Sequence, residues 1–209
     1  MSGEDDTMVF GALTVQAPLR LDCGEFVLRP LVESDAELDY EAVMESREQL
    51  RAWEQSTWPA DDFTVDANRD DLHRHAAEHR RGESFTYTVV APDEGVCLGC
   101  VYLFPPTVRW LEGVEITAVA GGDEWSAVDA LVYFWVRTSS LADGLDRRLL
   151  EALCDWLTSA WPFARPVFVT NEGLTQQVAL LSDAGLAPRF ELVDPDKPAK
   201  ELAFERGER

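Results

Sequence analysis

Val132-Tyr133-Phe134-Trp135-Val136 is a nearly continuous run of apolar and aromatic residues, and Asp143-Gly144-Leu145-Asp146 follows it after a short polar interval. The run predicts a strand that is buried on both faces. The residues beyond it predict an amphipathic helix with one apolar face, formed by Leu145, Leu149, Leu150, Leu153, Trp156 and Leu157. A strand, a tight turn and a helix in this order direct free backbone N–H groups and the positive end of the helix at one point, which suits a phosphate.

Two carboxylates already stand at this turn. Asp143 is placed to N-cap the helix, and Asp146 falls in the first turn, where a negative charge suits the helix dipole. Unit charges about 4 Å apart repel by roughly 4 kcal/mol at an effective dielectric of about 20. The turn therefore predicts either a weakened phosphate site or a helix whose own carboxylates take the place of a phosphate at its N-terminus.

The segment from Phe134 to Leu150 resembles the acetyl-CoA motif of the GNAT (GCN5-related N-acetyltransferase) acyltransferases. In that motif a Val-Arg pair is followed by Arg/Gln-x-x-Gly-x-Gly/Ala at the start of a helix. Val136-Arg137 matches the pair, Leu141 stands at the Arg/Gln position, Gly144 at the first required glycine and Asp146 at the second. Of the last three, Gly144 keeps the residue of the motif.

Other segments resemble the RimJ/RimL branch of the GNAT family, in the right order along the chain. They are a strand at 26–31, a helix start at 33–35 with Ser34 or Asp35 as N-cap, Leu50-x-x-Trp53, a helix at 65–81, two strands at 84–91 and 96–104, a strand at 166–170, a helix end at 180–186 and a last strand at 200–205. The resemblance covers residues 20–206. It implies an α+β (α/β three-layer) fold, a mixed, twisted sheet flanked by helices, with a splay between the strands at 128–137 and 166–170.

Composition limits the class of protein. The 209 residues predict one acyltransferase-like domain at 9–209 after a loose acidic tail at 1–8. The net charge of −21 makes nucleic acid and anionic membrane poor partners, and it reflects salt adaptation, GC-rich codon use or attraction of a cationic substrate. The acidic N-terminus and four scattered cysteines predict a cytoplasmic protein.

The Cys97-x-x-Cys100 pair lies in a predicted strand, where alternation places the two thiols on opposite faces. His75 and His79 share a helix face next to Glu78, but no further ligand is placed by the sequence to close a metal site. We therefore expect no metal.

The resemblance also implies roles for particular residues. It places the cofactor acetyl-CoA along Phe134, Val136 and Arg137, with its phosphates near Ala142, Gly144 and Leu145, and with Asn171 nearby; it places the acceptor groove at Trp53, Trp58 and His75. Leu131 stands where related sequences carry a catalytic Glu, so the candidate bases are Asp129, on the same strand face, and Glu115 in an insertion at 105–126. Tyrosine is missing after Gly185, and Leu174 and Gln177 replace the Asn and Ser of an Asn-x-x-Ser motif.

The resemblance implies an acetyl-CoA-dependent N-acetyltransferase that acts on a primary amine, either of a small molecule or of a protein N-terminus. The alternative is a non-catalytic GNAT-like binding module that has lost acetyl-CoA. Trp110 and Trp125 in the insertion are expected to be shielded from solvent, either by the domain's own groove or by a second copy of the chain. Of the two we expect a homodimer. No residue in the sequence chooses the acceptor.

Overall fold

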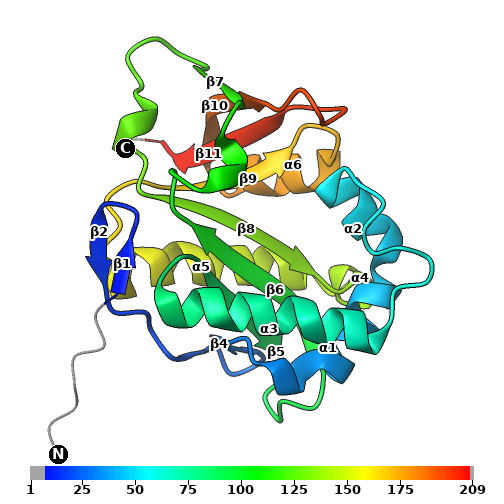
Figure 1. Ribbon diagram of the computed structural model, residues 1–209. Helices are drawn as coiled ribbons and strands as arrows, with labels where there is room; N and C mark the ends of the chain where they lie inside the picture. The colour runs from blue at the N-terminus through cyan, green and yellow to red at the C-terminus, as the bar shows by residue number, and fades with distance from the viewer. Residues whose placement is uncertain (1–7, 208–209) are drawn as a thin grey trace, which may run out of the picture.

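The computed structural model describes residues 8–207, and its main feature is a mixed sheet of nine strands (Figure 1). In spatial order the strands are β3 (Leu21–Asp22), β4 (Val27–Pro30), β5 (Phe85–Val90), β6 (Cys97–Phe104), β8 (Ala130–Val136), β9 (Pro166–Asn171), β11 (Glu201–Arg206), β10 (Leu186–Val193) and β7 (Glu115–Ala118). A separate hairpin consists of β1 (Met8–Phe10) and β2 (Leu13–Val15). The predicted mixed sheet is confirmed.

Helices cover both faces of this sheet, as Figure 1 shows with α3 in front and α5 behind. The first face carries α1 (Ala36–Glu45), α2 (Arg47–Glu54) and α3 (Val65–Arg81), and the second carries α5 (Leu145–Ala160) and α6 (Thr175–Asp183). Short helical turns join these elements: η1 (Glu33–Asp35), η2 (Arg109–Leu111), η3 (Trp125–Ala127) and α4 (Thr138–Leu141). Within residues 8–207 no helix is long and apolar enough to cross a membrane.

Strand β8 is buried along its whole length, as its sequence predicts. Its even-numbered side chains, such as Phe134, pack in the core under α5. Its odd-numbered side chains, Leu131, Tyr133 and Trp135, face the opposite side. Each face of β8 thus meets a different core, which explains why the strand shows no polar alternation.

The predicted splay between β8 and β9 is confirmed by their register. The two strands are parallel, and they pair only where Ala130, Leu131 and Val132 lie opposite Pro166, Val167 and Phe168. Beyond Val132, β8 continues beside β6 as far as Val136, whereas β9 continues beside β11 as far as Asn171. The facing edges of β8 and β9 therefore separate in their second halves.

Helix α3 has the predicted bounds, Val65–Arg81. The Oγ1 of Thr64 accepts a hydrogen bond from the backbone N–H of Ala67 at 3.1 Å, and Gly82 ends the helix in the left-handed region with φ of 71°. Local chemistry sets both ends.

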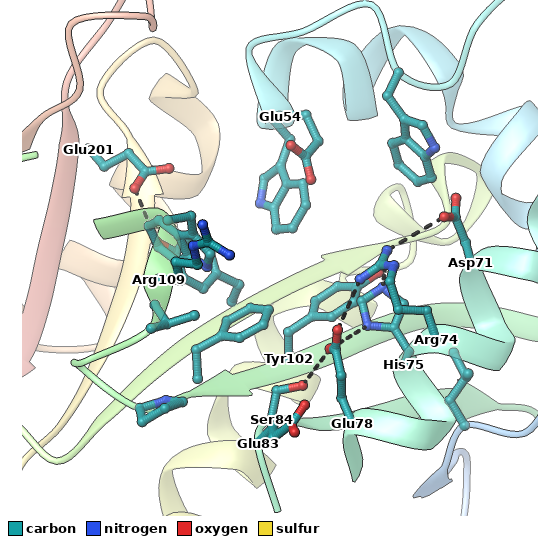
Figure 2. Close-up of a pocket in the computed structure, with 18 of the residues that line it drawn as sticks. Glu54, Asp71, Arg74, His75, Glu78, Glu83, Ser84, Tyr102, Arg109 and Glu201 are labelled. Carbon is teal, nitrogen blue, oxygen red and sulfur yellow. Dashed lines mark hydrogen bonds and ion pairs between the residues drawn. The ribbon is translucent and has the colours of Figure 1, made fainter. Parts of the chain in front are cut away.

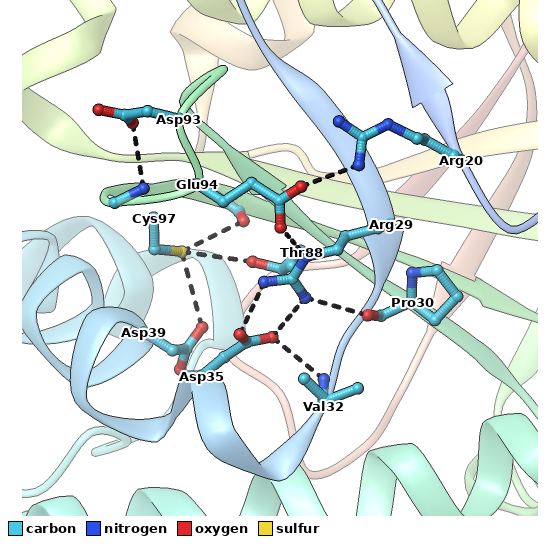
Figure 3. A network of polar contacts seen from close by, with 12 residues as sticks. Arg20, Arg29, Pro30, Val32, Asp35, Asp39, Thr88, Asp93, Glu94 and Cys97 are labelled. Atoms are coloured by element: carbon cyan, nitrogen blue, oxygen red, sulfur yellow. Dashed lines mark hydrogen bonds and ion pairs between the residues drawn. The ribbon is translucent and has the colours of Figure 1, made fainter.

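The predicted N-cap Asp143 is wrong. The N-cap of α5 is Gly144, whose φ of 69° is left-handed and whose lack of a side chain leaves the cap without a side-chain bond; Asp143 lies outside the helix. Asp35 is the N-cap residue of α1, but its carboxylate makes no cap bond, because it binds the guanidinium of Arg29 at 2.8 Å and the N–H of Val32 at 3.1 Å (Figure 3). Arg29 in turn reaches Glu94 at 2.7 Å.

The prediction that Cys97 and Cys100 lie on opposite faces is also wrong, since both are buried in the cluster under α1 to α3. The cause is an irregularity in β6: Gly99 pairs with Val89 but Cys97 pairs with Val90, which leaves Leu98 as an extra residue. This bulge shifts the alternation by one position. Neither thiol forms a disulfide.

Other elements went unpredicted. Strand β7, in the insertion at 105–126, pairs with β10 at the edge of the sheet, and Met8 belongs to β1 rather than to the predicted tail. The rest of that tail lies outside the described residues.

Candidate active site

Two cavities lie beside β8. The larger, of about 1370 Å³, is a cleft between α3, Tyr102 and Phe104 of β6, Tyr133 of β8, and the strands β10 and β11 (Figure 2). The smaller, of about 270 Å³, lies at the splay between β8 and the starts of α5 and α6. Trp53, near the end of α2, borders both.

The larger cleft contains the three residues predicted for the acceptor groove, Trp53, Trp58 and His75. Helix α3 contributes one face to it because Asp71, His75 and Glu78 recur every three to four residues. Tyr102 of β6 and Tyr133 of β8 lie directly opposite each other in the sheet and form its floor.

Aromatic rings form much of the wall. The ring of Trp53 lies 6.0 Å from those of Tyr102 and Tyr133, measured between centroids. Trp110 lies 6.0 Å from Phe104 and 5.9 Å from Tyr133, and Trp125 packs on Phe190 at 5.2 Å. The tryptophans of the insertion therefore contact their own domain, one of the two covers considered from the sequence.

Two carboxylates, Glu54 and Glu201, flank Tyr133 in the cleft. The hydroxyl of Tyr133 donates to Oε2 of Glu201 at 3.0 Å. Within residues 8–207 the carboxylate of Glu54 has neither an ion pair nor a hydrogen bond, although its backbone carbonyl accepts from Lys197. Figure 2 shows Glu54 and Glu201 on opposite sides of the upper part of the cleft.

Burial sets the protonation of this group. It raises the pKa of Glu54, an effect that the nearby charges of Lys197 and Arg74 oppose. It also raises the pKa of Glu201, against the hydrogen bond from Tyr133. The pKa of the Tyr133 hydroxyl lies well above its usual value, first through burial and then through the charge of Glu201. Both carboxyls therefore hold a proton more tightly than in water, which moves them toward the range of a general base.

His75 is neutral at physiological pH. Burial and the charge of Arg74 lower its pKa to about 4. Its Nδ1 lies 3.3 Å from the hydroxyl of Thr86, and its ring lies 5.6 Å from that of Tyr102. An imidazole of this kind can accept or donate one hydrogen bond but carries no charge.

The charge of the cleft is negative. Seven carboxylates and three cationic side chains line it. The cation Arg74 lies 3.5 Å from both Asp71 and Glu78, and Glu83 is paired with Arg81 at 2.7 Å. The carboxylates of Glu54 and Glu201 form no ion pair within residues 8–207, although the charge of Lys197 acts on both.

The smaller cavity contains Phe134 and Val136, as predicted for the cofactor. Leu141 and Asp146 also line it, whereas Ala142, Gly144 and Leu145 form the adjoining turn and do not. The guanidinium of Arg137 is held elsewhere, since its Nε binds Glu45 at 2.6 Å and lowers the pKa of that carboxyl to about 2. Asp146 thus brings a carboxylate to the cavity and Arg137 brings no free cation.

Asn171, predicted to lie near the cofactor, links β9 to α2. It lines neither cavity; its side-chain amide donates to the carbonyls of Ala52 and Trp53 at 2.9 and 3.1 Å. Since Ala52 and Trp53 belong to α2, Asn171 fixes the end of that helix to β9. It positions Trp53 and Glu54.

The structure places the two predicted bases outside both cavities. The carboxylate of Asp129 accepts hydrogen bonds from the backbone N–H groups of Ala164 and Arg165, at 2.7 and 3.1 Å, and so holds the chain before β9. Glu115 is exposed on the edge strand β7. Neither faces the cleft, so the structure brings them together with none of the predicted groove residues.

Sequence reasoning missed Glu54, Tyr133 and Glu201. Tyr133 had a signal, because it lies two residues after Leu131 on the same strand face. Glu54 follows a residue that was predicted for the groove. Glu201 had no signal, since only the pairing of β11 with β9 brings it near α2. Among residues 8–207 no group of three His, Cys, Asp or Glu side chains could hold a metal ion.

No family model matches the chain, and no curated protein matches it in sequence. Solved structures match along most of its length. The ribosomal-protein-S5-alanine acetyltransferase from Vibrio fischeri is 16% identical with a TM-score of 0.66, covering 90% of this chain and 96% of that one. RimJ from Mycobacterium smegmatis, in complex with CoA-disulfide, is 18% identical with a TM-score of 0.65, covering 91% and 86%.

A third structure is the microcin C7 self-immunity acetyltransferase MccE in complex with acetyl-CoA and AMP. It is 10% identical with a TM-score of 0.64, covering 88% of this chain and 92% of that one. At such identities the likeness establishes the architecture. The chain has the GNAT fold, in the form found in RimJ/RimL acetyltransferases.

Proposed function

We propose that this GNAT-fold protein transfers an acetyl group from acetyl-CoA to a primary amine. The observation that carries the proposal is the splay of β8 and β9, which opens the edge of β8 at Phe134 to a cavity that shares Trp53 with the larger cleft. The similar structures include two with CoA-disulfide or acetyl-CoA bound, which supports the same cofactor here.

The residues that would hold acetyl-CoA fit it in part. At Phe134 and Val136 the edge of β8 has no strand partner in β9, and the N–H and C=O of one strand residue point to the same side, so both groups of Phe134 face the gap, where its C=O accepts from Gln177. The turn at 142–145 offers the N-terminus of α5 to phosphates, although Asp146 opposes them. When bound, the cofactor supplies an acetyl thioester, and a backbone N–H at this edge would polarise its carbonyl.

We assign the general base to Glu54 in place of Asp129 and Glu115. Its half-buried carboxylate faces the cleft without a partner, and its raised pKa favours removal of a proton from an ammonium group. Glu201, held by Tyr133, would bind the same ammonium before the proton leaves. The pair of carboxylates supports a cationic acceptor.

The acceptor class follows from the neighbours and the cleft together. The similar structures include ribosomal-protein and microcin-immunity acetyltransferases, and the cleft is wide enough for either a peptide terminus or a small amine. We also propose a cytoplasmic location and a homodimer. Sedimentation at high micromolar concentration, in low and high salt, tests the dimer, and a monomer in both conditions overturns it.

The alternative, a non-catalytic binding module, is favoured by two observations. The cofactor cavity contains the carboxylate-bearing Asp146 and a side-chain bridge by Gln177. Both oppose an anionic cofactor that inserts between the strands.

Calorimetric titration with acetyl-CoA separates the two functions. If the protein is an acetyltransferase, it should bind acetyl-CoA and acetylate amines in a panel of peptides and small molecules. Glu54→Gln should lower kcat about 100-fold with the Kd for acetyl-CoA unchanged. Glu83→Gln is the matched control, because it lines the same cleft but is already paired with Arg81. No heat at millimolar acetyl-CoA would exclude the enzyme.

A further inference from the structure

Gln177 spans the gap between β8 and β9. It lies in the first turn of α6 and is half-buried. Its Nε2 donates to the backbone carbonyl of Phe134 on β8 at 3.0 Å. Its Oε1 accepts from the hydroxyl of Thr170 on β9 at 2.7 Å. One side chain thus joins the two strands where their own pairing has ended.

A glutamine side chain carries the same groups as a peptide bond, a carbonyl acceptor and N–H donors. In this gap it therefore acts like one residue of a strand inserted between β8 and β9. An amide-bearing arm that entered the gap alongside β8 would need the same Phe134 carbonyl. Gln177 lines the cavity of about 270 Å³ and already bonds this carbonyl, so an arm that bonds it in the same direction must displace the Nε2 of Gln177.

We propose that Gln177 is an intramolecular competitor for the cofactor slot and sets its affinity for CoA. The proposal rests on the proposed function, because it assumes that CoA enters between β8 and β9. Binding then requires the Nε2 of Gln177 to leave the Phe134 carbonyl, and the hydrogen-bond free energy lost there is subtracted from the binding free energy. The bridge keeps the buried Phe134 carbonyl and the Thr170 hydroxyl satisfied when CoA is not bound.

Calorimetry with CoA, which has no acetyl group to transfer, tests the proposal without turnover. Gln177→Ala should bind CoA about ten-fold more tightly than the wild type, equal to about 1.4 kcal/mol and within the net range of one hydrogen bond. Gln176→Ala is the matched control, because Gln176 borders the same cavity from the next position and is exposed. It should leave the Kd unchanged.

A second variant acts from the other strand. Thr170→Val keeps the buried shape but removes the hydroxyl that holds Oε1 of Gln177. It should therefore also lower the Kd for CoA, by a smaller factor than Gln177→Ala. The side-chain amide signals of Gln177 in a nitrogen-15 spectrum, assigned by their loss in Gln177→Ala, should exchange slowly with solvent in the free protein and shift when CoA is added.

The outcomes separate this inference from the proposed function. If the wild type binds CoA and Gln177→Ala binds it equally or more weakly, the competitor is excluded and the proposed cofactor stands. If Gln177→Ala alone binds at millimolar CoA, the bridge is confirmed as what closes the slot. If neither protein binds, both proposals fail.

Discussion

Asp39 in α1 is a carboxylate enclosed by protein. Its Oδ2 accepts from the side chain of Asn68 at 3.0 Å, and its Oδ1 has only the thiol of Cys97 at 3.9 Å (Figure 3 shows the latter contact). Burial raises its pKa from 3.8 to about 6. Because the folded state holds this proton more tightly than the unfolded state, Asp39 lowers the stability as the pH rises through the window from about 4 to 6.

Asp39→Asn should therefore stabilise the protein at pH 7.5, by up to about 3 kcal/mol from the two pKa values, and have little effect at pH 4. The amide can still accept from Asn68. Urea unfolding of both proteins at the two pH values measures the difference. Equal differences at pH 4 and pH 7.5 would show that the proton on Asp39 is not the cause.

Asp146 is the second residue with a consequence for charge. Its side chain borders the cofactor cavity, and Oδ1 accepts from the N–H of Arg147 at 2.8 Å. Asp146→Asn should tighten acetyl-CoA binding at least ten-fold, a fraction of the roughly 4 kcal/mol Coulomb limit. Asp143→Asn, exposed at the same turn and outside the cavity, is the control. Equal Kd values for Asp146→Asn and the wild type would leave Asp146 with a role in the helix alone.

At the scale of elements, the bulge in β6 depends on Gly99. Its φ is +155°, and a Cβ there would overlap the backbone carbonyl oxygen of Trp135 on β8. Gly99→Ala should destabilise the protein by roughly 1–3 kcal/mol, as overpacking does, because backbone atoms cannot move aside without shifting β8. Gly121→Ala is the control, since nothing lies within 4 Å of its Cβ position. Thermal unfolding that ranks the two variants equally would contradict this account.

The elements also show how far sequence reasoning reaches. The helix at 65–81 and the buried strand around Phe134 were predictable because periodicity and caps are local properties. The faces of Cys97 and Cys100 were not, because one extra residue in β6 reverses the alternation, and only the backbone conformation reveals it.

The candidate site also combines residues that the sequence could predict with residues that it could not. Trp53, Trp58 and His75 line the larger cleft and Phe134 and Val136 line the smaller cavity, and the order of elements along the chain is what placed them near each other. Glu54 and Glu201 are far apart in the chain, and they line the same cleft because β11 pairs with β9 while Asn171 ties α2 to β9. Tertiary pairing of this kind leaves no local pattern.

Over the whole molecule, 39 acidic residues and 18 basic ones give a net charge of −21. This charge attracts a cationic acceptor and repels the anionic CoA. Raising the salt from about 0.05 to 0.5 M shortens the Debye length roughly three-fold. The KM for a cationic acceptor should then rise several-fold, while the Kd for the anionic CoA should fall. Initial rates and calorimetry at the two salt concentrations measure both. Parallel trends would mean that the charge of the protein does not guide its ligands.

The shared wall at Trp53 makes the two cavities energetically dependent on each other. A ligand that fixes this indole from one side changes the free energy of binding on the other, and thermodynamic linkage requires the effect to be reciprocal. Acceptor and cofactor should therefore alter each other's affinity by one common factor. A coupling of about 1 kcal/mol would change both affinities roughly five-fold, whichever ligand binds first.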